Sequence, residues 1–161
     1  MIWYLLTIVL AVIADQITKW AIIAAYPAVG DGTALIPGVL NFTHVDNTGA
    51  ALGMMKDSRW VFMIVSAVAI VLMLVYLIKW PPKSRLTGLS LALIIGGGIG
   101  NMIDRVFRGF VIDFIDFCAF PKIWKYVFNV ADICVCVGCA AAVLCFVFFE
   151  WKDEKKKEET T

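Results

Sequence analysis

The chain has 161 residues, of which 61% are hydrophobic and 17% are charged, and its formal net charge is +1. A soluble domain is typically nearer half apolar, so this composition argues against a soluble globular protein. The near-neutral charge gives no support for nucleic-acid binding, and we expect no nucleic-acid partner.

The first predicted element is a membrane helix over residues 2–25. Its apolar run MIWYLLTIVLAVIA is interrupted by Asp15 and Lys19 before WAIIAAY resumes. A cleaved signal peptide is the alternative, but no basic residue precedes the run, and the two charges fall where its apolar core would continue. We therefore favour a retained helix. The i,i+4 spacing of Asp15 and Lys19 predicts an ion pair on one helix face.

A long connection, residues 26–58, follows this helix and is rich in proline and glycine, which break regular structure. Within it VLNFTHV (Val39–Val45) loosely alternates β-branched and aromatic residues, which predicts a short strand. We interpret His44 as an ordinary loop residue, because it is the only histidine and no zinc-binding motif accompanies it.

Three further apolar runs predict membrane helices over residues 59–79, 86–106 and 130–150. They contain uncharged stretches of 19, 18 and 17 residues, and about 20 helical residues cross a bilayer core of about 30 Å. The basic segment KWPPKSR predicts a tight turn between the second and third helices. In the third helix, GGGIG offers small residues that let neighbouring backbones approach closely.

A second long connection, residues 107–129, precedes the last helix. Phe110, Ile112 and Phe114 alternate in it with Asp113 and Ile115, as the two faces of a strand do. Its aromatic residues suit the headgroup layer of a membrane. The tail, residues 151–161, has mixed charge, and we expect it to be disordered.

These elements predict a single α-helical integral membrane domain over residues 1–161, with both termini on one side. The turn and the tail on that side hold seven Lys and Arg residues, and the other side holds six. By the positive-inside rule, this small difference favours cytoplasmic termini but does not decide the orientation. In that orientation the tail at 151–161 is cytoplasmic and the connections at 26–58 and 107–129 are extracytoplasmic. Four of the five cysteines lie in the predicted last helix and are interpreted as small apolar side chains: Cys134, Cys136, Cys139 and Cys145. Cys136-x-x-Cys139 has zinc-like spacing, but no second pair or histidine accompanies it.

Polar residues gather at the predicted outer ends of three helices, although each carboxylate in a membrane costs several kcal/mol unless it is paired or hydrated. They are Asp15, Asn101, Asp104, Arg105, Asn129 and Asp132, with Asp113 and Asp116 in the adjoining connection. Two close carboxylates do not both ionise easily, so one can hold a proton while the other activates water. Such a pair can hydrolyse an amide without metal or cofactor.

Two other functions remain open at this point. An ion-coupled transporter would use Asp15, Asp104 and Asp132 as relay groups, but it predicts polar groups in both leaflets. A non-enzymatic scaffold would leave the aspartates on one face unexplained. Asn129 is also a plausible helix N-cap, although we expect that capping alone would not require Asp132.

Four sequence blocks, in order along the chain, resemble the lipoprotein signal peptidase (signal peptidase II) family of bacterial intramembrane aspartic proteases, peptidase family A8. The blocks are DQITKW (Asp15–Trp20), NTGAALG (Asn47–Gly53), GGGIGNMIDR with GFVIDFIDF (Gly96–Phe117) and FNVAD (Phe128–Asp132). Leu52 stands where the family more often has phenylalanine.

The resemblance implies four transmembrane helices with a small extracytoplasmic β-cradle and a short periplasmic helix that acts as a lid. It also implies removal of signal peptides from diacylglyceryl-prolipoproteins immediately before the lipid-modified cysteine. The implied partners are these substrates, membrane lipid and a globomycin-type inhibitor, with no cofactor or metal. We expect a monomer in the bacterial cytoplasmic membrane, with its active site near the outer leaflet.

The resemblance also assigns site residues by motif position. Asp113 and Asp132 are the catalytic pair, and Asp116, the second aspartate of DFIDF, is not a member of it. The substrate-binding residues are Asn47, Asn101, Arg105 and Asn129, and the supporting polar network is Asp15, Lys19 and Asp104.

Overall fold

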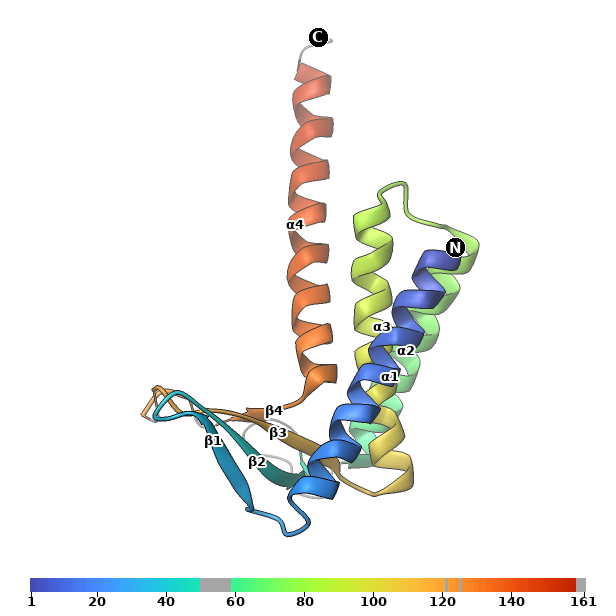
Figure 1. Ribbon diagram of the computed structural model, residues 1–161. Coiled ribbons are helices and arrows are strands. Elements are labelled where there is room, and N and C mark those ends of the chain that lie inside the picture. Colours follow the sequence, from blue (N-terminus) through green and yellow to red (C-terminus); the bar gives the residue numbers. More distant parts are fainter. Residues whose placement is uncertain (50–58, 121, 125, 159–161) are drawn as a thin grey trace.

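The computed structural model describes residues 1–49, 59–120, 122–124 and 126–158 (Figure 1). Its helices are α1 (Ile2–Ala25), α2 (Arg59–Lys79), α3 (Arg85–Phe107) and α4 (Val130–Glu158). Its strands are β1 (Gly32–Ile36), β2 (Leu40–Asn47), β3 (Val111–Phe117) and β4 (Val127–Phe128). The strands form one antiparallel sheet in the order β1-β2-β3-β4 at one end of the helices. Both chain termini lie at the opposite end (Figure 1).

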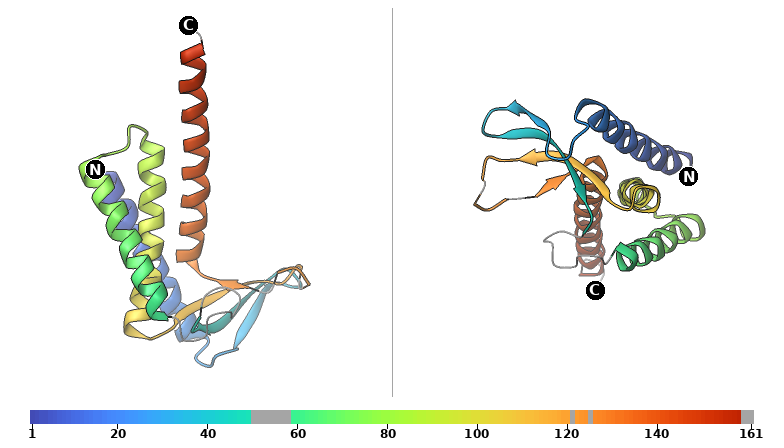
Figure 2. Two further views of the ribbon diagram at one scale, coloured as in Figure 1. Left: turned by 180° about the vertical axis from the view of Figure 1, so that it is seen from behind. Right: turned by 90° about the horizontal axis from the view of Figure 1, so that it is seen from below.

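Helix α3 is central, and α1, α2 and α4 each pack against it (Figure 2). Its glycines make these contacts close, as the GGGIG run predicted. A Cβ atom added to Gly97 would lie 2.3 Å from the carbonyl oxygen of Ala131 in α4, and one on Gly96 would lie 2.7 Å from the Cβ of Ala11 in α1. Neither position could hold a larger residue without moving a neighbouring helix.

The predicted membrane helices are confirmed as helices close to their predicted bounds. Helices α1 and α3 and the Val130–Phe148 part of α4 are long and apolar enough to cross a membrane. In α2 the apolar stretch among the described residues, Met63–Lys79, is shorter than those of the other three helices. The chain is therefore a multi-pass membrane protein.

The predicted strands are confirmed by β2 and β3, but the other two strands were not predicted. All five residues of β1 are exposed, so no alternation of buried side chains marks it, and β4 has only two residues. The short periplasmic helix has no counterpart among the described residues, and residues 50–58 of the first connection lie outside them.

The prediction of a disordered tail was wrong for residues 151–158, because α4 continues to Glu158. The segment WKDEKKKE is rich in lysine and glutamate, which are strong helix formers. Extending an existing helix also avoids the cost of nucleating a new one.

Strand β2 carries a one-residue bulge where it pairs with β3. Phe42 lies opposite Ile115 and Val45 lies opposite Asp113, so three steps along β2 match two along β3. Such a bulge changes the face to which the following side chains point.

Candidate active site

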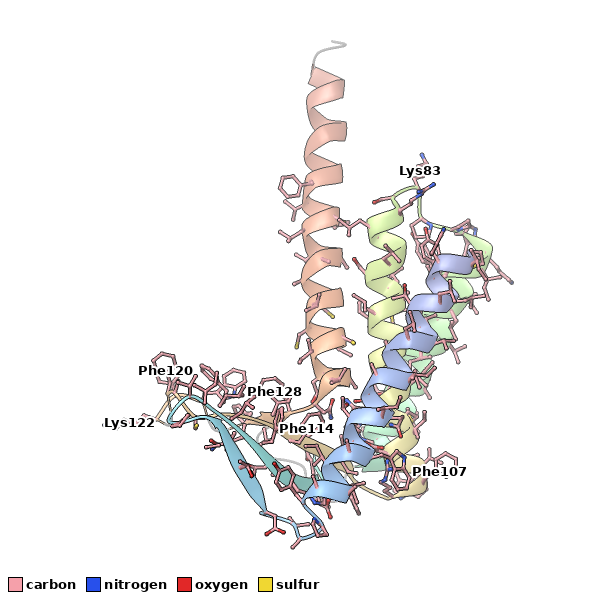
Figure 3. All side chains as sticks on the ribbon, in the orientation of Figure 1. Lys83, Phe107, Phe114, Phe120, Lys122 and Phe128 are labelled. Atoms are coloured by element: carbon pink, nitrogen blue, oxygen red, sulfur yellow. The ribbon has the colours of Figure 1, made fainter. Side chains whose placement is uncertain are left out.

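A pocket of about 570 Å³ opens where the sheet meets the start of α4. It is lined by Asn47, Gly49, Arg105, Asp113, Trp124, Tyr126, Val127, Phe128, Asp132, Ile133, Cys136 and Val137. Figure 3 places Phe128 at this junction, between the sheet and the nearby end of α4. The polar residues of the lining include both predicted catalytic aspartates, and most of the remaining wall is apolar or aromatic.

Asp113 projects from β3 and is only 2% exposed. The amide nitrogen Nδ2 of Asn47 donates to its Oδ2 at 2.8 Å, and Nδ2 of Asn129 donates to its Oδ1 at 2.7 Å. The carboxyl group is thus held by a neighbouring strand on one side and by the start of α4 on the other.

The bulge in β2 explains how Asp113 and Asp116 receive partners from one strand. The two aspartates are three residues apart, so their side chains point to opposite faces of β3. Asn41 and Asn47 are six apart and would share a face in a regular strand. Because the bulge lies between them, Asn47 bonds Asp113 while Asn41 bonds Asp116 at 3.3 Å. Asp116 is not among the pocket-lining residues.

Asp132 lies in the first turn of α4 and forms a reciprocal cap with Asn129. The backbone N–H of Asp132 donates to Asn129 Oδ1 at 2.9 Å, and the backbone N–H of Asn129 donates to Asp132 Oδ2 at 3.2 Å. This is the capping-box arrangement with asparagine and aspartate in its two positions. The expectation that capping would not require Asp132 was therefore wrong: Asp132 caps the helix and also faces the pocket.

Asn101 and Asn129 lie behind the carboxylates and are not among the pocket-lining residues. Asn101 Nδ2 donates to Asp132 Oδ1 at 2.8 Å, and Asn129 Nδ2 donates to Asn101 Oδ1 at 3.0 Å. Asn129 therefore bonds both Asp113 and Asp132, and Asn101 supports it from α3. Of the four residues expected to bind substrate, only Asn47 and Arg105 face the pocket.

A buried ion cluster lies beneath the asparagines and confirms the predicted ion pair. Lys19 Nζ lies 2.9 Å from Asp15 Oδ2 and 2.7 Å from Asp104 Oδ2, and it donates to Asn101 Oδ1 at 2.9 Å. All three donor positions of the ammonium group are used. Lys19, Asp15 and Asp104 are each 0% exposed, so their charges are stable only because they are paired.

The ion cluster also fixes the position of α4. Asp15 Oδ1 accepts a hydrogen bond from the backbone N–H of Ala131 at 3.0 Å, which satisfies one of the free N–H groups at the start of the helix. A Cβ on Gly100 would lie 2.5 Å from Asp15 Oδ2. Gly100 thus leaves room for an α1 carboxylate to reach α4 past α3.

Sequence reasoning missed two members of the network, Gln16 and Arg108. Gln16 Nε2 bonds Asp15 Oδ2 at 3.1 Å, the carbonyl of Gly100 at 3.2 Å and Asp104 Oδ1 at 3.3 Å. Arg108 pairs with the same oxygen of Asp104, Oδ1. The available signals were the place of Gln16 within DQITKW and the i,i+4 spacing of Asp104 and Arg108.

Desolvation controls the protonation of Asp113. Burial raises its pKa from 3.8 to about 7; the hydrogen bond from Asn47 opposes this rise, and the nearby Asp132 carboxylate adds to it. Near neutral pH, Asp113 can therefore hold a proton that an ordinary aspartate has lost.

The described residues contain no group of three or more His, Cys, Asp and Glu side chains placed to hold a metal ion. His44 is a buried residue of β2, not the loop residue we expected. Its Nδ1 lies 2.7 Å from the carbonyl oxygen of Tyr26, so the ring links the end of α1 to the sheet.

Comparison with known proteins agrees with this geometry. The family model for signal peptidase (SPase) II matches residues 7–148. A lipoprotein signal peptidase of Symbiobacterium thermophilum is 42% identical over 155 residues, which cover 92% of this chain and 98% of the relative. One of Bacillus pumilus is 38% identical over 161 residues, with full coverage of both chains. A solved bacterial membrane enzyme structure is 32% identical, with a TM-score of 0.82 over 91% of this chain and 88% of that chain. This chain belongs to the signal peptidase II family.

Proposed function

We propose that this protein is a lipoprotein signal peptidase of the aspartic type. It cleaves diacylglyceryl-prolipoproteins immediately before the lipid-modified cysteine, with Asp113 and Asp132 as the catalytic residues. The observation that carries the proposal is that both carboxyl groups line one pocket and both accept hydrogen bonds from Asn129. Asp113 accepts from its side-chain amide and Asp132 from its backbone N–H.

In the proposed reaction Asp113 starts protonated and Asp132 starts ionised. Asp132 takes a proton from water as the water oxygen attacks the scissile carbonyl carbon, and Asp113 gives its proton to the carbonyl oxygen. Collapse of the tetrahedral intermediate returns a proton to Asp113, and Asp132 gives its proton to the leaving amine. The raised pKa of Asp113, about 7, supports its role as the resting acid.

The charges around the site are consistent with one shared proton. The cluster comprises four carboxylates (Asp15, Asp104, Asp113, Asp132) and three cations (Lys19, Arg105, Arg108). With Asp113 neutral, three negative charges meet three positive charges. If Asp113 were ionised as well as Asp132, one negative charge would be left uncompensated in a poorly hydrated site.

The other residues divide into two roles. Asn47 and Arg105 line the pocket and would contact the substrate, and the Arg105 guanidinium can stabilise negative charge that develops on the carbonyl oxygen. Asn101 and Asn129 are positioning residues, which hold the two carboxyl groups through the hydrogen bonds described above. Asp15, Lys19 and Asp104 support those asparagines from below.

We further propose a single domain with four membrane spans, α2 being the fourth, in the bacterial cytoplasmic membrane. Both termini would be cytoplasmic, and the sheet would form an extracytoplasmic cradle with a short lid helix nearby. The pocket would then lie at the outer surface of the cytoplasmic membrane. Ile133 and Val137 of α4 line it and are 41% and 52% exposed. Acyl chains of the substrate can remain in the bilayer along this face while the scissile bond reaches the carboxylates.

We also propose a monomer as the active unit, because one chain supplies both proposed catalytic aspartates. A globomycin-type inhibitor would compete for the same pocket.

The direct test of this function is cleavage of a diacylglyceryl-prolipoprotein peptide by the purified protein, with products identified by mass spectrometry. We expect a product whose first residue is the lipid-modified cysteine, and at least tenfold slower cleavage of the same peptide without lipid. Cleavage at another bond, or equal cleavage of the two peptides, would contradict the proposal.

A further inference from the structure

A second pocket lies between the first turns of α1 and α3, at the end of the helices away from the sheet. Its volume is about 500 Å³, within the range of about 300–1,000 Å³ that is common for small-molecule sites. It is lined by Met1, Trp3, Tyr4, Leu6, Thr7, Leu10, Arg85 and Leu89. None of these residues takes part in the proposed catalysis. In Figure 3, the labelled Lys83 marks this end of the molecule.

Helix α1 supplies an apolar wall to this pocket. Trp3, Leu6, Thr7 and Leu10 follow the i, i+3, i+4, i+7 spacing of a single helix face. Trp3, Leu6 and Leu10 are 66%, 44% and 63% exposed, so the protein leaves much of this face uncovered. The Thr7 hydroxyl donates to the Trp3 carbonyl oxygen at 2.9 Å, so its hydrogen-bonding capacity is used within the helix.

Helix α3 supplies the rest of the pocket and its charge. Leu89 follows Arg85 by four residues, so both lie on one helix face. Arg85 is exposed, and among the described residues no carboxylate pairs with it. The Tyr4 ring closes the pocket against α3, since a Cβ added to Gly88 would lie 2.3 Å from the ring.

The chain segments that form and flank this pocket carry positive charge. Neither residues 1–14 nor residues 59–103 contain an aspartate or glutamate, whereas Lys79, Lys83 and Arg85 are basic. The apolar wall extends about 10 Å along the helix axis from Trp3 to Leu10, at 1.5 Å per residue. The pocket therefore combines a cation at its end with a hydrocarbon surface running toward the middle of the helices.

We propose that this pocket binds an anionic phospholipid. The lipid phosphate contacts Arg85, and an acyl chain lies along Trp3, Leu6 and Leu10. Free phosphate would use the cation but not the apolar wall, and a zwitterionic lipid would gain less from the unpaired positive charge. The two features together fit one amphipathic anion.

Native mass spectrometry of the full-length protein in detergent tests this proposal. Phosphatidylglycerol and phosphatidylcholine are added in equal amounts, and the bound fraction of each is measured. We expect preferential binding of phosphatidylglycerol. One basic residue near an anionic lipid surface contributes about 1 kcal/mol, so Arg85→Gln should weaken this binding about fivefold. Lys79→Gln removes the same charge from a residue that does not line the pocket, and it should bind as the wild type does.

A second variant pair tests the apolar wall. Leu10→Trp fills the pocket and should lower the phosphatidylglycerol-bound fraction at least twofold, whereas Val9→Trp, on the neighbouring non-lining residue, should not. Thermal unfolding of all four variants checks that each is folded. Asp113→Asn should bind lipid normally, so the result does not depend on the proposed catalysis.

Three results would overturn the lipid assignment. The first is equal phosphatidylglycerol binding by Arg85→Gln and Lys79→Gln. The second is unchanged binding by Leu10→Trp. The third is complete displacement of the lipid by inorganic phosphate, which would indicate a simple phosphate site.

Discussion

At the scale of single residues, Asn129 connects the two carboxyl groups. Its Nδ2 bonds Asp113, its Oδ1 bonds the backbone of Asp132, and its backbone N–H bonds the Asp132 carboxylate. One residue therefore sets the relative position of the two proposed catalytic groups. The cap alone is worth about 1 kcal/mol, whereas a small misplacement of catalytic groups costs about a hundredfold in rate.

Asn129→Ala should therefore lower kcat about a hundredfold while reducing the free energy of unfolding by only about 1–3 kcal/mol, since the buried Asp113 also loses a donor. Peptide cleavage and thermal unfolding measure the two effects. Asn41→Ala is the matched control, because Asn41 bonds Asp116 away from the pocket. Similar activity losses in both variants would contradict the role given to Asn129.

The raised pKa of Asp113 predicts a pH dependence. Because the acid form is required, kcat/KM should fall as pH rises above about 7. The Asn47 hydrogen bond lowers this pKa, so Asn47→Ala should move the falling limb to higher pH. Asn41→Ala should leave it in place, and a limb that moves to lower pH in Asn47→Ala would be inconsistent with the assignment.

The same group links folding stability to pH. Folded Asp113 keeps its proton between pH 3.8 and about 7, whereas the unfolded chain releases it in this interval. Its contribution to stability is therefore present below pH 3.8 and is lost as pH rises through about 7.

At the scale of elements, the helices were predictable because their apolar runs are long, and the predicted bounds of residues 2–25 and 59–79 agree with α1 and α2. The strand at Val39–Val45 was predictable from its alternation. The bulge between Phe42 and Val45 was not, because it depends on pairing with β3. Because the sequence does not reveal the bulge, it could not show that Asn47 bonds Asp113 and that Asn41 bonds Asp116.

Helix packing around α3 supports a prediction about its glycines. Gly100→Ala places a Cβ 2.5 Å from Asp15 Oδ2, so it should displace the carboxylate that binds the start of α4. We expect a loss of about 1–3 kcal/mol in the free energy of unfolding, measured by thermal unfolding in detergent, together with lower activity.

Gly98→Ala is the matched control for this change. Its Cβ would lie 3.1 Å from the tip of the Ile70 side chain, which can move. Alanine also has the higher helix propensity, so this variant should be neutral or more stable. Equal destabilisation by the two substitutions would mean that the Asp15 contact is unimportant.

At the scale of the whole molecule, the buried polar residues occupy one end. Apart from Ser90, whose hydroxyl bonds the Leu86 carbonyl in its own helix, the buried polar side chains that the structure describes lie in the sheet or in the sheet-side parts of the helices. A transporter would need such groups across the full membrane depth. The directions of the predicted helices were enough to place this cluster at one end of the molecule. The sequence could not predict the hydrogen bonds within the cluster, because they join residues up to 116 positions apart.

The proposed fourth span predicts opposite sides for two exposed residues. Asp31 precedes α2 and Lys83 follows it, so they are separated by the membrane only if α2 crosses it. In a cysteine-free background, an impermeant thiol reagent should label Asp31→Cys in intact spheroplasts and label Lys83→Cys only after permeabilisation. Labelling of both in intact spheroplasts would exclude α2 as a span.

The central claim is that Asp113 and Asp132, and not Asp116, carry the chemistry. The most direct measurement is the rate at which the purified variants Asp113→Asn, Asp132→Asn and Asp116→Asn cleave a diacylglyceryl-prolipoprotein peptide. General acid–base catalysis contributes about 10²–10⁴-fold, so the first two variants should lose at least a hundredfold, while Asp116→Asn should retain most of its activity. Near-normal cleavage by Asp113→Asn or Asp132→Asn, or an equal loss in Asp116→Asn, would contradict the account.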